Sequence, residues 1–128
     1  MNREEFEVKV LLYIMIKSLE EISKVDEEMQ EILEDFDAKI QWKLGDLRAY
    51  LVFGEGKVTG KLDEEIENPD VTLIMHDLTK AKMLLSGELD GTSAYMSGDL
   101  TIEGNLQITM QMTEITELIY DYMELIRE

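Results

Sequence analysis

The chain has 128 residues, a single proline, no cysteine and a formal net charge of -17 at pH 7. This length suits one domain with its own hydrophobic core. The absence of cysteine excludes disulfides, thiol nucleophiles and thiolate metal sites. Because binding to phosphate groups requires clustered Lys and Arg, the strong negative charge argues against nucleic acid and anionic membranes as partners.

Nothing near the N-terminus predicts export or membrane insertion. The apolar run over residues 8–16 contains Lys9 and is too short to span a bilayer. Its upstream flank is acidic, whereas a signal peptide requires a basic one. The final residues, 125–128, do not form a peroxisomal targeting tripeptide. The sequence therefore predicts a cytoplasmic protein without stable membrane insertion.

Residues 1–36 have the apolar spacing of amphipathic helices, with a predicted break between Ser23 and Asp26. Some of the apolar residues recur every seven positions: Val8, Met15, Ile22, Met29 and Phe36. A heptad stripe of this kind has two uses. It can pack onto the domain's own sheet, which we favour, or it can form a homodimer through the N-terminal helices.

From residue 38 the apolar period changes to two, which is typical of strands. Residues 38–44, 47–53 and 57–62 alternate in this way, and short glycine-containing turns separate them. Such short connections predict an antiparallel meander. The odd-numbered residues of the middle strand, including Leu47 and Phe53, are expected to face the core.

The second half alternates between strands and helices. Residues 63–70 form a polar loop, and residues 71–75 form a β-rich, buried strand. Asp77 is the expected N-cap of a helix that Gly87 closes. A second short helix over residues 92–97, a strand over residues 99–103 and a last amphipathic helix from Leu106 complete the prediction.

The residues required for catalysis are scarce. His76 is the only histidine, and its neighbour Asp77 is better explained as a helix cap than as a catalytic partner. Gly54, Gly56 and Gly60 lack the spacing and the helix of a dinucleotide-binding fingerprint. The loop at Asp90 lacks the alternating oxygen ligands of a calcium site. We therefore predict a protein that is not an enzyme and has no catalytic residue, cofactor or metal.

The chain has nine methionines, and five of them, Met75, Met83, Met96, Met110 and Met112, lie in the second half at element ends or on the last helix. Methionine is unbranched and polarizable, so it fills gaps in a core and also adapts to flexible apolar ligands. Composition alone favours the first use.

Three segments in order change this interpretation: residues 68–75 with Asp-Val-Thr, residues 84–90 with a helix ending in glycine, and residues 94–105 with a small-aromatic-x-x-Gly stretch and a strand ending in Gly-Asn. This order resembles the sterol carrier protein-2 family, whose last helix is rich in Leu and Met. The resemblance covers roughly residues 38–112. The first 36 residues are similar only as an amphipathic helix.

The resemblance implies an α+β fold in which helices cover one face of a five-stranded mixed β-sheet and leave a hydrophobic tunnel beneath them. Residues 1–128 would form one such domain, with amphipathic helices over 1–36 and the sheet and C-terminal helices over 38–128. It also implies non-catalytic binding and transfer of a lipid or fatty-acid-like molecule: a fatty acyl group, a phospholipid or a sterol-like molecule. The alternative is a protein-interaction or dimerisation module of the same fold with a filled core.

We expect the tunnel to be lined by the following residues: Trp42, Leu73, Met75, Met83, Leu84, Tyr95, Met96, Leu106, Met110 and Ile115. Binding would be driven by the burial of apolar area. The sequence contains no evident polar or basic anchor, so we expect poor discrimination between head groups.

Overall fold

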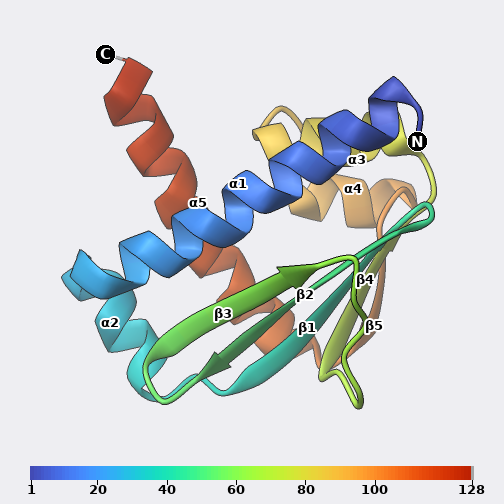
Figure 1. Cartoon of the computed structure of the whole chain (residues 1–128). Helices are drawn as coiled ribbons and strands as arrows, with labels where there is room; N and C mark the ends of the chain where they lie inside the picture. The colour runs from blue at the N-terminus through green and yellow to red at the C-terminus, as the bar shows by residue number, and fades with distance from the viewer. Residues whose placement is uncertain (128) are drawn as a thin grey trace.

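A computed structural model describes the backbone of residues 1–127 and, within the last helix, the side chains up to residue 122 and that of residue 124. The elements in chain order are α1 (Arg3–Val25), α2 (Glu27–Glu34), β1 (Ala38–Leu44), β2 (Leu47–Gly54), β3 (Lys57–Leu62), β4 (Val71–Met75), α3 (Leu78–Ser86), α4 (Gly91–Ser97), β5 (Thr101–Gly104) and α5 (Leu106–Arg127). Figure 1 shows the helices on one side of the sheet.

The strands form one five-stranded sheet in the order β3-β2-β1-β4-β5. The pairs β1–β2, β2–β3 and β4–β5 are antiparallel, whereas β1 and β4 are parallel. The predicted meander and the mixed sheet are thus confirmed. The parallel pair at the centre brings the second half of the chain beside the first strand.

Local capping explains where the helices begin and end. Asp26 ends α1 and begins α2, because its side chain accepts a hydrogen bond from the Met29 amide at 2.8 Å. The predicted break in the N-terminal helix lies at this residue. Asp77 caps α3 by accepting from the amides of Thr79 and Lys80, and Gly87 ends α3 in the left-handed conformation with φ 87°.

The Gly-Asn pair at the end of β5 has a structural cause. Gly104 has φ +112°, and a Cβ atom at this position would collide with the carbonyl oxygen of Asp70. Asn105 then caps α5, because its Oδ1 accepts from the amides of Gln107 at 2.9 Å and Ile108 at 3.1 Å. The strand is shifted from the predicted residues 99–103 to 101–104, since the amide of Leu100 still bonds to Ala94 in α4.

A solid core lies between α1, α2 and the strands β1 to β3. The odd-numbered side chains of β2 are buried, as predicted. In the heptad stripe Val8, Met15, Met29 and Phe36 are buried and Ile22 packs against them, while the Phe36 ring lies 5.0 Å from that of Phe53. The heptads therefore pack onto the chain's own sheet, which is the use that the sequence favoured.

Candidate functional site

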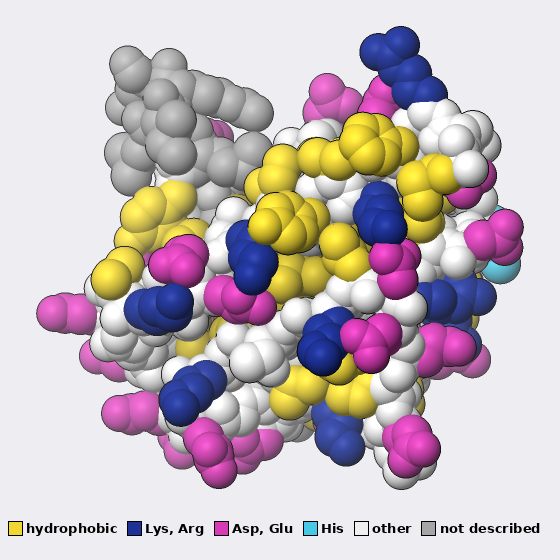
Figure 2. Space-filling view, viewed as in Figure 1, with side chains coloured by type: hydrophobic (Ala, Val, Ile, Leu, Met, Phe, Trp, Pro, Cys, Tyr) yellow, Lys and Arg dark blue, Asp and Glu magenta, His cyan; other side chains and the backbone are white. Residues whose placement is uncertain are grey.

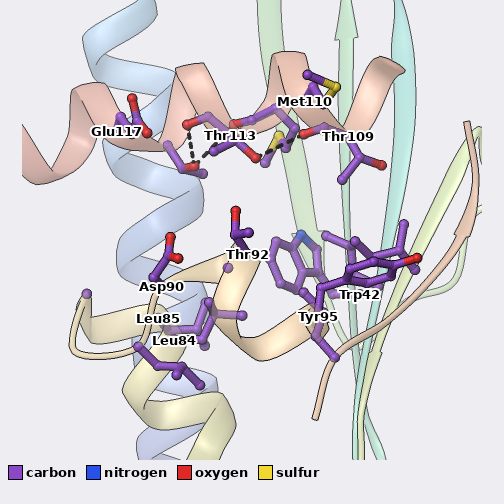
Figure 3. Close-up of a pocket in the computed structure, with 18 of the residues that line it drawn as sticks. Trp42, Leu84, Leu85, Asp90, Thr92, Tyr95, Thr109, Met110, Thr113 and Glu117 are labelled. Carbon is purple, nitrogen blue, oxygen red and sulfur yellow. Dashed lines mark hydrogen bonds between the residues drawn. The ribbon is translucent and has the colours of Figure 1, made fainter. Parts of the chain in front are cut away.

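A cleft of about 440 Å³ lies between the sheet and the helices α3, α4 and α5 (Figure 3). Its floor is apolar and buried, with Trp42 from β1, Leu73 from β4, Leu100 and Met112. Side chains at its mouth are exposed. The structure thus shows an open cleft at the place where a tunnel was expected, and a closed tunnel stays a prediction.

Strand pairing builds the floor. In the sheet register Trp42 lies opposite Leu73, and Leu73 lies opposite Ile102 on β5. Residues directly opposite one another project to the same face, so these three side chains form one row across three strands. All three line the cleft. The row exists because β1 and β4 are parallel neighbours.

The indole nitrogen of Trp42 has no hydrogen-bond partner among the residues that the structure describes, although this residue is only 5% exposed. Indole N–H is a donor only. A buried donor without a partner costs roughly 1–3 kcal/mol. Figure 3 shows this nitrogen on the edge of the ring that faces α5, across the space between α4 and α5. The floor therefore contains an unused donor.

Threonines line the wall that α5 contributes. Thr109, Thr113, Thr116 and Tyr120 all border the cleft, because their spacing places them on one face of the helix. The Thr109 and Thr113 hydroxyls each donate to a carbonyl of their own helix at 3.1 Å. Thr116 has the same kind of bond to the carbonyl oxygens of Met112 and Thr113. With their protons used in this way, the hydroxyl oxygens can only accept from a ligand.

Tyr120 joins α5 to α3. Its hydroxyl donates to the carbonyl oxygen of Leu84 at 2.9 Å, and burial raises the pKa of the phenol. A Cβ atom on Gly87 would lie 3.4 Å from the Tyr120 ring, so the glycine that ends α3 also leaves room for this ring. The contact closes one side of the cleft.

Two carboxylates stand at the mouth, those of Asp90 and Glu117 (Figure 3). Asp90 also caps α4, since its Oδ2 accepts from the amide and the hydroxyl of Ser93, each at 3.2 Å. Among the described residues that line the cleft there is no Lys or Arg. The cleft therefore has polar lining groups that the sequence did not single out, and those that are charged are acidic; the expectation of poor discrimination between head groups stays a prediction.

Most of the predicted lining residues border this cleft. They are Trp42, Leu73, Leu84, Tyr95, Leu106 and Met110. They come from five different elements: β1, β4, α3, α4 and the start of α5. The fold thus brings together residues that are up to 68 positions apart (42 to 110).

The other predicted lining residues do not border it. Met75 and Ile115 are fully buried in the core, Ile115 on the face of α5 that packs against the domain. Met96 is 78% exposed, because consecutive residues of a helix project to different sides and Met96 directly follows Tyr95 on α4. Met83 borders a separate, more open depression between α1 and α3.

That second depression is bridged by an ion pair. Lys82 Nζ lies 2.8 Å from the carboxylate of Glu7, and this bond lowers the pKa of Glu7 and raises that of Lys82. Both side chains are partly exposed, so the pair contributes little to stability. We find no reason to treat this depression as the functional site.

Several lining residues were missed by sequence reasoning. The threonines of α5 gave a usable signal, because hydroxyl residues at positions 109, 113, 116 and 120 follow helical spacing. Met15, which reaches the cleft from α1, gave none. Its place depends on how α1 crosses the sheet.

His76 is exposed, follows directly after β4 and is not among the residues that line the cleft. Within the described part of the chain, no three side chains of the metal-binding types come together as a candidate metal site. Of the helices described, none has the length and apolarity that crossing a bilayer requires.

A family model described as the SCP-2 sterol transfer family matches residues 19–117, which is more than half of the chain. The chain belongs to the SCP-2 sterol transfer family. The resemblance noted in the sequence is thereby confirmed, and the match extends from the end of α1, at residue 19, over all strands to the middle of α5. A comparison with curated proteins found no match.

Solved structures show the same SCP-2 fold. The solution structure of sterol carrier protein domain 2 of Helicoverpa armigera is 27% identical, with a TM-score of 0.64 over 92% of this chain and 91% of that one. Palmitated SCP2L2 from Aedes aegypti is 13% identical, with a TM-score of 0.58 over 79% and 89% of the two chains. At that identity the likeness concerns the fold alone.

The sec-alkylsulfatase Pisa1 from Pseudomonas sp. also contains an SCP-2-like part. It is 17% identical, with a TM-score of 0.56 over 67% of this chain. This chain spans only 14% of the length of that enzyme. The likeness therefore concerns a small part of the sulfatase, and its activity does not carry over.

The outer face of α1 in this SCP-2 domain carries exposed apolar side chains, those of Phe6, Val10, Tyr13 and Ile14. Figure 2 shows hydrophobic side chains gathered along this helix, with charged ones between them. We call these residues the outer α1 stripe. These residues are different from the buried heptad residues. A homodimer through the N-terminal helices stays a prediction, and its interface would have to include the outer α1 stripe.

Proposed function

We propose that this SCP-2 domain binds one apolar, lipid-like molecule in the cleft between the sheet and α4 and α5, without catalysing a reaction. The observation that carries the proposal is the apolar floor formed by Trp42, Leu73 and Leu100 beneath an open mouth. Ligand sites typically have volumes of about 300–1,000 Å³. The cleft volume, about 440 Å³, lies within this range.

The energetics of a cavity support a site that exchanges its contents. An empty, dry cavity of this size would cost roughly 10 kcal/mol at about 24 cal/mol per Å³, as much as the whole stability of a typical domain. The exposed mouth avoids this cost, because water or a ligand can enter. A ligand that replaces water over the apolar floor gains about 25 cal/mol for each Å² removed from water.

The ligand classes that we propose are fatty acyl groups, phospholipids and sterol-like molecules. The Aedes aegypti relative is described as palmitated, and the family is named for sterol transfer. The side chains at the cleft also suit binding better than chemistry. Its carboxylates are exposed, and Asp90 is engaged in capping α4. The same proposal includes transfer of the bound lipid from a donor to a recipient.

Trp42 provides a direct test, because it is the only tryptophan of the chain and lies in the floor of the cleft. Titration with a neutral acylglycerol should change its emission and saturate at one ligand per chain. Thr116→Phe should weaken this binding strongly, since a phenyl ring on the cleft face of α5 would occupy the site.

Glu114→Phe is the matched control for this titration. It adds the same ring two residues away, at an exposed position that does not border the cleft. We expect it to bind as the wild type does. Equal loss in both variants, or no saturable change in the wild type, would contradict the proposal. Organic extraction of the native protein followed by mass spectrometry should identify a co-purified lipid.

The alternative function, an interaction module with a filled core, is supported by the outer α1 stripe but not by the interior. The core is solid under α1 and α2, whereas the cleft occupies the half under α4 and α5. Both properties therefore coexist in one molecule. We favour binding of a small molecule because the floor of the cleft is apolar and buried beneath an open mouth.

A further inference from the structure

We propose that the cleft selects a neutral amphiphile that has a hydrogen-bond-accepting oxygen near its apolar chain, such as an ester or amide carbonyl, and that it disfavours a free carboxylate. This inference rests on the proposed function and specifies its ligand. It comes from the hydrogen-bonding groups of the lining and from the sign of their charge.

The first step is the donor in the floor. The Trp42 indole N–H is buried, has no partner within the described part of the chain, and lies on the edge of the ring that faces α5 (Figure 3). Buried polar groups in folded proteins almost always have partners. A hydrocarbon chain alone would leave this donor unsatisfied. A carbonyl or ether oxygen that reaches the floor would accept from it, with a small shift of the side chains that cover the nitrogen.

The second step is the polarity of the wall and mouth. The hydroxyls of Thr109, Thr113 and Thr116 donate to their own helix, so their oxygens face the cleft as acceptors. Asp90 and Glu117 add negative charge, and the described lining residues include no Lys or Arg. An anionic head group would therefore lie among acceptors and like charges.

Together these groups specify the order of polar atoms along the ligand. The acceptor oxygen lies deep, at Trp42, and hydroxyl or amine donors lie further out, near the threonines and the carboxylates. Monoacylglycerols and acyl amides have this order. A fatty acid ionised at neutral pH has an acceptor but carries the wrong charge for the mouth.

A matched ligand series tests the head-group preference on the full chain. Dodecanoic acid, its monoglyceride and dodecane share one chain length and differ in the head. At about pH 8 the acid is ionised. Displacement of a neutral fluorescent acyl probe should show the monoglyceride binding about tenfold more tightly than the acid, a difference that corresponds to about 1.4 kcal/mol.

The outcomes separate the two proposals. Binding of none of the three ligands would contradict the proposed function itself. Binding of the acid as tightly as the monoglyceride would leave lipid binding intact and overturn the head-group preference.

Charge variants test the acidic mouth. Asp90→Asn with Glu117→Gln should raise the affinity for dodecanoic acid relative to that for the monoglyceride, and Asn still caps α4. The matched control is Glu88→Gln with Glu114→Gln, which removes equal charge from exposed positions that do not line the cleft. If both double variants gained the same affinity for dodecanoic acid, the effect would come from the overall charge of the chain, and the proposed role of the two carboxylates at the mouth would be overturned.

Trp42→Phe tests the donor. It keeps an aromatic ring in the floor but removes the N–H, so the monoglyceride should bind about fivefold more weakly, the cost of one hydrogen bond. Dodecane, which cannot accept a hydrogen bond, should lose less affinity than the monoglyceride. An equal loss for both ligands would show that Trp42 contributes packing alone and would overturn its role as a donor.

Discussion

The hydroxyl of Tyr122 on α5 donates a hydrogen bond to the carboxylate of Asp26, with 2.6 Å between Oη and Oδ2. Asp26 is also the residue at which α1 ends and α2 begins, and its other oxygen accepts from the Met29 amide. One side chain thus connects three helices. Since α5 forms a wall of the cleft, this bond helps to hold that wall in place.

Removal of the Tyr122 hydroxyl is expected to loosen α5. Tyr122→Phe should lower the unfolding temperature by less than Asp26→Ala does, because the second change also removes an N-cap that contributes about 1 kcal/mol. Thermal unfolding followed by circular dichroism measures both. Tyr13→Phe, an exposed tyrosine on α1, is the control and should have no effect.

The same pair should make stability depend on pH. The hydrogen bond from Tyr122, followed by that from the Met29 amide, lowers the pKa of Asp26 below its usual 3.8. This contribution is present above pH 3.8 and is lost as pH falls through the lowered pKa of the folded state.

At the alkaline end the sign is reversed. The bond to Asp26 raises the pKa of Tyr122 above its usual 10.0, so its contribution is present below pH 10.0 and is lost as pH rises through the raised value. The difference in unfolding free energy between wild type and Tyr122→Phe should be constant near neutrality and shrink at both ends. A difference that is flat from acid to alkaline pH would contradict this account.

Gly104→Ala should disrupt the edge of the sheet. Gly98→Ala is the matched control, because Gly98 also has a positive φ of 86° but nothing lies within 4 Å of an added Cβ. The control should cost about 1–2 kcal/mol for the left-handed backbone alone. Gly104→Ala should cost clearly more, since β5 must move away from Asp70. Chemical denaturation measures both, and equal losses would argue against the close contact.

Deletion of residues 1–22 should abolish folding. Val8 and Leu19 are fully buried and Leu12 is 1% exposed, so α1 is part of the core and not an appendage. Circular dichroism should show loss of cooperative unfolding. A truncated chain that still folds would contradict this prediction. A test of dimerisation therefore requires a change in the outer α1 stripe, such as Ile14→Glu, with sedimentation as the readout.

Tyr120→Phe should open one side of the cleft. The variant loses the bond to the Leu84 carbonyl, which contributes about 1 kcal/mol, and keeps the ring. We expect faster release of a bound lipid, measured by stopped-flow Trp42 fluorescence. Tyr95→Phe also removes a tyrosine hydroxyl from the cleft, but one on an exposed side chain. It should change the release rate less.

The local features of the fold were readable from the sequence. The break at Asp26, the cap at Asp77, the glycine after α3 and the alternation of β2 all lie where the pattern predicted them. Each depends on hydrogen bonds or side-chain directions within a few residues. The order of the motifs also indicated the family, because this fold brings Gly104 close to Asp70 and gives Gly87 a left-handed backbone, and both positions favour glycine.

The composition of the cleft was decided by the tertiary structure. Met75 and Met83 have the same chemistry as Met110, yet only Met110 borders the cleft, since the crossing of helices and strands decides which side chain faces it. The parallel pairing of β1 with β4 joins residues about thirty positions apart and creates the row from Trp42 to Ile102. Side-chain type and periodicity are properties of neighbours in sequence, whereas an unused donor or an acidic mouth arises only when distant segments pack together.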